Sequence, residues 1–165
     1  MLYFWFPTPA EQSRRARILI AGYILIAVGW LVEIGALCTP EWIVGSKNYG
    51  ILPYPDEYSN WPWAIAGCWL MYIASANCFF IFFIYIGLVR SVKIHGWGSR
   101  LRKFYYAISL FCAINGVLIF TSFMIFAINE SKLDYRIGYS GYLGLVSALC
   151  YVIASSVFVV FNRNI

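Results

Sequence analysis

The side chains that could carry out acid–base or metal chemistry are few and scattered. His95 is the only histidine, and it lies in a basic segment, KIHGWGSR. The chain has no CxxC or HxxxH pair, no glycine-rich phosphate loop after a strand, and no two carboxylates within one apolar stretch. We therefore predict that the protein is not an enzyme and that it holds neither a metal ion nor a cofactor.

Three polar side chains that interrupt long apolar stretches are more informative. Glu33 lies about 7.5 Å inside one end of its stretch, and Asn77 and Asn115 each lie about 20 Å from the same side, at about 1.5 Å per helical residue. An unpaired amide in lipid is costly, so we predict that the two asparagines bond to each other or to a neighbouring helix, in preference to forming an ion pathway. For Glu33 two interpretations stay open: an acid with a function, or a structural acid whose hydrogen bonds are satisfied.

These side chains must be positioned by four long apolar stretches: residues 18–38, 63–89, 104–128 and 141–161. A helix of about 20 apolar residues crosses the hydrocarbon core of a bilayer, and lipid forces such a segment to satisfy its own backbone hydrogen bonds. Only 12% of the residues are charged, against about 25% in soluble proteins. The sequence therefore predicts an all-α membrane protein, in which residues 1–165 form a single four-transmembrane-helix bundle.

The charges outside these stretches sort by sign and predict the orientation. Residues 1–17, 90–103 and 162–165 carry nine of the twelve lysines and arginines, whereas the other two loops carry five of the seven acids. Lysine and arginine stay on the cytoplasmic side of short loops, so both termini are predicted to be cytoplasmic. The basic middle loop is predicted to contact anionic lipid, and not nucleic acid.

Two smaller predictions concern the N-terminal segment and the cysteines. Residues 1–13 are predicted to lie along the inner membrane interface, with Pro7 and Pro9 keeping them out of the first helix. The five cysteines all lie within or at the edges of the apolar stretches, where free cysteine behaves as a small hydrophobe.

The first outer loop, residues 39–62, is predicted to contain a short β-hairpin or a short sheet of at most two or three strands. EWIV and YGIL flank GSKN, whose glycine and asparagine suit a turn. Pro53 and Pro55 follow and stop further pairing, because neither has an N–H. Trp42 is expected to hold this loop on the bundle.

The residues after the hairpin are predicted to form an exposed tip that binds a partner. The candidate partner-binding residues are Trp42 at the base of the loop and Tyr54, Asp56, Glu57 and Tyr58 at its tip. Aromatic rings are common interface anchors, and neighbouring acids steer a basic partner. The alternative is a solvated turn whose tyrosines rest on lipid headgroups.

Small residues indicate where the helices approach closely. Ser140, Gly144 and Ala148 lie at i, i+4 and i+8, which places them on one narrow face. Two interpretations of this face stay open: it packs within the chain, or it forms a groove that faces lipid or a partner. Asn129 begins a glycosylation sequon, Asn129-Glu130-Ser131, which abuts the membrane.

Three features together resemble the claudin superfamily, which includes the peripheral myelin proteins and the calcium-channel gamma and AMPA-receptor regulatory subunits. They are the segment TPEWIVG (39–45), the segment GYSGYLGLVSA (138–148), and the pattern of a large first loop, a small second loop and cytoplasmic termini. The chain departs from the superfamily in this first loop, which is larger than the second loop but about half as long as is usual in the superfamily. The loop has no cysteine pair and keeps Trp42 alone of the usual Gly-Leu-Trp and cysteine core.

The resemblance implies a plasma-membrane protein whose partners are other integral membrane proteins, an ion channel or copies of itself. The short loop favours an auxiliary subunit that packs laterally against an ion channel or receptor. The alternative is a cell-junction, adhesion or membrane-organising protein.

Overall fold

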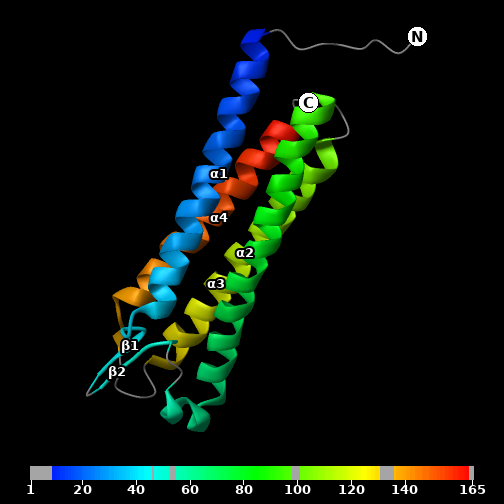
Figure 1. Cartoon of the computed structure of the whole chain (residues 1–165). Coiled ribbons are helices and arrows are strands. Elements are labelled where there is room, and N and C mark those ends of the chain that lie inside the picture. The colour runs from blue at the N-terminus through cyan, green and yellow to red at the C-terminus, as the bar shows by residue number, and fades with distance from the viewer. Residues whose placement is uncertain (1–8, 46, 53–54, 98–100, 131–135, 164–165) are drawn as a thin grey trace.

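The computed structural model describes residues 9–45, 47–52, 55–97, 101–130 and 136–163. Within these residues four long helices run along one another: α1 (Pro9–Cys38), α2 (Pro62–His95), α3 (Arg102–Glu130) and α4 (Tyr139–Arg163) (Figure 1). Each is long and apolar enough to cross a membrane. The predicted four-helix membrane fold is confirmed.

Each helix extends beyond the apolar stretch that predicted it. α1 begins at Pro9, so the prediction that residues 9–13 lie outside the first helix was wrong. Proline is tolerated in the first turn of a helix because the N–H that it lacks has no intrahelical partner there. α2 continues to His95 and ends at Gly96, whose φ of 70° suits glycine and whose N–H bonds to the carbonyl of Val92.

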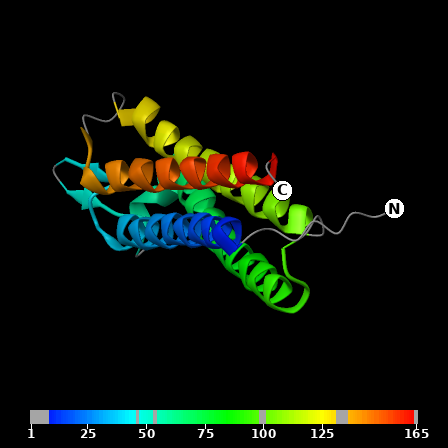
Figure 2. The ribbon, with the colours of Figure 1, turned by 90° about the horizontal axis from the view of Figure 1, so that it is seen from above.

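The helices do not contact one another equally. α1 packs along α4, α4 along α3, and α3 along α2, whereas α1 and α2 touch much less (Figure 2). Aromatic rings join α1 to α2: Trp30 lies 5.8 Å from Phe79 and 5.3 Å from Phe82, between ring centroids. The α1–α2 seam is therefore the least tightly packed side of the bundle.

The two loops at the end of the bundle away from the termini form a small cap. Its described residues hold three two-residue strands, β1 (Ile43–Val44), β2 (Asn48–Tyr49) and β3 (Arg136–Ile137), in the antiparallel order β2-β1-β3. The β1–β2 hairpin agrees with the prediction. β3 comes from the loop between α3 and α4 and was not predicted. A 3-10 turn, η1 (Asp56–Asn60), leads into α2.

Candidate functional site

Polar side chains from all four helices meet inside the bundle. Glu33 comes from α1, Asn77 and Cys78 from α2, Asn115 from α3 and Tyr151 from α4. Asn77 retains 9% of its exposure, and the other four side chains are fully buried. We call these five residues the polar network.

The hydrogen bonds of the polar network form one continuous chain. Asn77 Nδ2 donates to Asn115 Oδ1 (2.8 Å), and Asn115 Nδ2 donates to Cys78 Sγ (3.1 Å). Cys78 Sγ lies 2.6 Å from the Tyr151 hydroxyl, which donates to Glu33 Oε2 (3.0 Å). Since the single hydroxyl proton of Tyr151 is committed to Glu33, the Cys78 thiol is the donor to Tyr151. All donors therefore point along the chain towards Glu33.

The geometry agrees with the pairing of Asn77 and Asn115 that their common depth predicts. The membership of Glu33 in the same network was not predicted, and Cys78 was predicted to be only a small hydrophobe. Tyr151 was missed altogether. A signal was present, because Tyr151 continues the Ser140–Gly144–Ala148 row at the next helical step.

Other buried hydroxyls tie the helices together near the network. Ser147 Oγ of α4 donates to the carbonyl of Gly29 in α1 (2.8 Å), and Ser122 Oγ of α3 donates to the carbonyl of Gly67 in α2 (2.8 Å). The described residues contain no group of three His, Cys, Asp or Glu side chains arranged to hold a metal ion. The network offers a chain of neutral donors that ends at one carboxyl group.

The small-residue face of α4 is occupied by the protein itself. Ser140, Gly144 and Ala148 are buried. A Cβ on Gly144 would lie 3.1 Å from the ring of Trp42, and a Cβ on Gly116 of α3 would lie 3.4 Å from the carbonyl oxygen of Ala148. This face therefore packs within the chain and is not a groove for a lipid or a partner.

Trp42 fastens the cap to the bundle, as its position after α1 led us to expect. The side chain is fully buried, and its Nε1 donates to the carbonyl of Ala36 in α1 (2.6 Å). The ring lies 5.2 Å from Phe126 of α3, between centroids, and rests on Gly144 of α4. Trp42 is thus an internal anchor and does not itself reach a partner.

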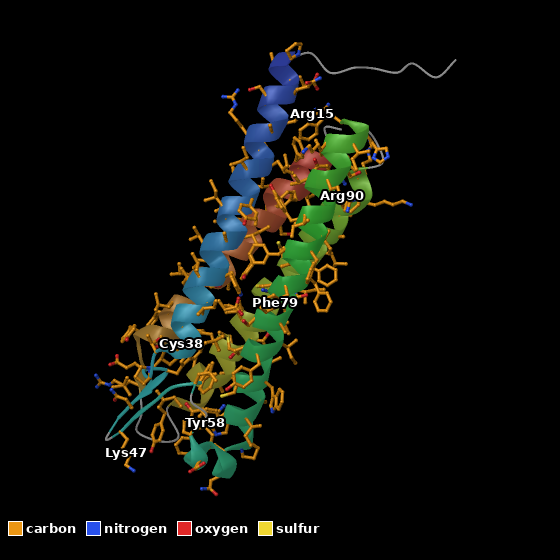
Figure 3. The ribbon with its side chains drawn as sticks, viewed as in Figure 1. Arg15, Cys38, Lys47, Tyr58, Phe79 and Arg90 are labelled. Carbon is orange, nitrogen blue, oxygen red and sulfur yellow. The ribbon has the colours of Figure 1, made fainter. Side chains whose placement is uncertain are left out.

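The prediction that Tyr58 lies on an exposed tip was wrong, because its side chain is fully buried (Figure 3). η1 turns the chain after Pro55, so the ring of Tyr58 packs 6.0 Å from Tyr49 and 5.8 Å from Trp61, between centroids. Burying so large an apolar ring lowers the free energy of this packing below that of a conformation in which the ring stays exposed on a turn.

Of the other residues predicted to form the tip, the structure describes the side chain of Asp56 alone. Asp56 is exposed on η1. Tyr54 and the side chain of Glu57 lie outside the described residues.

Asn129 lies in the last turn of α3, where its Nδ2 donates to the carbonyl of Ile125 (2.8 Å). The nitrogen that would carry a glycan is thus turned back onto the helix. This placement does not favour use of the sequon.

Most of the basic residues that the structure describes gather at the end of the bundle opposite the cap. Arg90 lies near the end of α2, and Arg102 and Lys103 are exposed at the start of α3. Arg15 of α1 is largely buried and pairs with Glu11 at 2.8 Å (Figure 3).

A family model described as "Tight junction protein, Claudin-like" matches residues 12–164, which include the polar network and the cap. No curated protein matches the chain.

Proposed function

Because the chain belongs to the family of claudin-like tight junction proteins, we propose that it acts by lateral association with other membrane proteins, as an auxiliary subunit of an ion channel or receptor. In this proposal the protein spans the plasma membrane with both termini and the 90–103 loop in the cytoplasm. The basic residues of that loop contact anionic lipid, and the cap faces the outside.

The observation that carries the proposal is the compactness of the cap. Its backbone is bonded directly to the helices beneath it: Leu52 N–H donates to the carbonyl of Leu37 in α1 (3.1 Å), and the Tyr72 hydroxyl of α2 donates to the carbonyl of Ile51 (2.8 Å). A cap held this close to the membrane reaches a neighbour in the same bilayer more readily than a protein in an opposing one.

The exposed side chains of the cap offer charges of both signs to such a neighbour. Asp56 is exposed on η1, and Arg136 is exposed on β3. Lys47 is exposed at the far end of the β1–β2 hairpin (Figure 3). Complementary charges on a partner set orientation and speed encounter. Of the residues predicted to bind a partner, Asp56 is the one whose described side chain is available to do so.

A second surface for lateral contact lies on α2. Trp69, Phe80 and Phe83 retain 60%, 60% and 71% of their exposure and project from the bundle. Because the small-residue face of α4 is buried, this aromatic row takes its place as the helix surface that a partner would contact within the membrane.

The alternative function is that of a junction or membrane-organising protein that polymerises side by side. The description of the matching family favours it, since it names tight junction proteins. The two functions differ in what the protein assembles with, a different membrane protein or copies of itself.

Affinity purification in mild detergent, followed by mass spectrometry, separates the two functions. The auxiliary-subunit proposal expects a channel or receptor in stoichiometric yield and predicts that Asp56→Lys weakens its recovery without lowering expression. Asn48→Lys is the control, because it adds a lysine at an exposed position of β2 and leaves η1 unchanged. Recovery of homopolymers alone would instead support the junction function. Equal recovery by Asp56→Lys would exclude η1 as the contact and direct attention to the aromatic row of α2.

A further inference from the structure

Glu33 is isolated from every positive charge in the membrane-spanning part of the chain. It is the only Asp, Glu, Lys, Arg or His in the four apolar stretches. Arg17, the next basic residue on α1, is about 24 Å away along the helix at about 1.5 Å per residue. The Glu33 side chain has no exposed surface. Outside the bundle, therefore, no water can solvate its carboxyl group and no cation can neutralise its charge.

The groups that face Glu33 are all neutral donors. Cys78 from α2 and Tyr151 from α4 are the titratable groups in contact with it, through Oε2 at 3.6 and 3.0 Å. α3 reaches it only through Asn115, which does not titrate, by way of Cys78. The second oxygen, Oε1, is buried and has no hydrogen-bond partner among the described residues.

The two forms of the carboxyl group fit this environment differently. A carboxylate would be a charge without a counter-ion in a low-dielectric interior, with one of its oxygens accepting no hydrogen bond, which is a costly state. A neutral acid carries no charge, keeps Oε2 as the acceptor for Tyr151, and leaves one O–H without an acceptor, which costs much less than a buried charge without a counter-ion.

We propose that Glu33 is a proton-binding site: the folded bundle holds a proton on Glu33 Oε1, and release of that proton to water leaves a carboxylate that strains the polar network. This inference does not depend on the partner or on the assembly proposed above.

The position of Glu33 connects the proton to the cap. Glu33 lies on α1 beside Cys78 of α2, at the seam where these two helices touch least. It is one helical turn from Ala36, whose carbonyl accepts the indole N–H of Trp42. The proton of the proposed site therefore lies one helical turn below the contact that fastens the cap to α1.

Infrared spectroscopy of the full chain in lipid bilayers tests the proposal on the wild-type protein. We expect a carbonyl stretch of a protonated carboxyl group at neutral pH that shifts on labelling with ¹³C-glutamate and disappears at alkaline pH. The label distinguishes glutamate from aspartate, and Glu33→Gln should remove the band. A folded wild-type protein without this band at neutral pH would overturn the proposal, whether or not the variant folds.

Tyr151→Phe supplies a readout that a purely structural role would not change. Its hydroxyl donates to Oε2 (3.0 Å), so its removal should change the frequency of the Glu33 carbonyl stretch. An unchanged frequency would show that the band does not come from Glu33 and would contradict the proposal.

Thermal unfolding in detergent gives an independent measure. The folded bundle binds the proton, whereas the unfolded chain exposes the carboxyl group to water and releases it, so the melting temperature of the wild type should fall as the pH rises. Glu33→Gln, which is neutral at every pH, should lose this dependence. An equal fall in both proteins would assign the pH dependence to another group and would contradict the proposal.

Discussion

Trp42 and Ala36 are joined by a hydrogen bond of 2.6 Å from the indole Nε1 to the backbone carbonyl oxygen. Carbonyls in the last turn of a helix have no intrahelical N–H donor, and at Ala36 this bond, together with the longer one from the Thr39 hydroxyl (3.3 Å), satisfies the carbonyl. The same side chain covers Phe126 of α3 and Gly144 of α4. One residue of the first loop thus connects the ends of three helices.

Trp42→Ala should therefore destabilise the whole protein and not only the loop. Truncation of a buried tryptophan costs about 3–5 kcal/mol, and we expect a lower melting temperature in detergent and reduced delivery to the cell surface. Trp42→Phe keeps most of the buried ring and loses only the hydrogen bond, about 1 kcal/mol. Wild-type stability and surface delivery of the alanine variant would show that the cap is held by other contacts.

The asparagine pair should behave as a coupled unit. Asn77→Leu leaves Oδ1 of Asn115 without its donor and should cost about 1 kcal/mol of stability. The double replacement with Asn115→Leu should recover part of that cost. Unfolding in mixed micelles measures all three variants. Ser122→Ala, which removes a different contact between the same two helices, should add independently to either change. Strict additivity of the two asparagine replacements would mean that the amides are not coupled.

Two glycines of α1 should respond in opposite ways to the same substitution. A Cβ on Gly22 would lie 2.5 Å from Cζ of the buried Phe158, whereas a Cβ on Gly35 meets nothing within 4 Å. Gly22→Ala should overpack the α1–α4 contact at a cost of about 1–3 kcal/mol. Gly35→Ala should be neutral, or stabilising by up to about 1 kcal/mol through helix propensity. Equal melting temperatures of the two variants would contradict the close approach of α1 and α4.

The proposed orientation predicts which cysteines an impermeant reagent reaches on intact cells. Lys47→Cys in the cap and Lys103→Cys at the start of α3 are both exposed positions at opposite ends of the bundle. In a Cys38→Ser background, which removes the exposed native thiol of α1, Lys47→Cys should be labelled from outside and Lys103→Cys only after permeabilisation. Labelling of position 103 on intact cells would invert the topology.

The features that sequence could predict depend on length, depth or local turn chemistry. The four spans follow from the length of the apolar stretches, and the Asn77–Asn115 contact follows from their equal depth, because helices in lipid have few alternatives for a buried amide. The β1–β2 hairpin follows from GSKN, whose residues suit a turn.

The features that sequence could not predict depend on tertiary contacts. Arg136 and Ile137 form a strand only because β1 offers them a free edge, and two residues carry no periodic signal. Tyr58 is buried because η1 turns it towards Tyr49 and Trp61, which local composition does not specify. Tyr151 looked like one more aromatic residue in an apolar helix until α1 and α2 placed Glu33 and Cys78 beside it.

The order of strands in the cap also sets an order for biogenesis. β1 is the central strand, but its partner β3 is synthesised only after α2 and α3. A nascent chain at the ribosome therefore presents β1 with one open edge, and open edges invite pairing with other chains. Synthesis of β3 closes that edge, so a chain that stops before β3 keeps one edge of β1 unpaired.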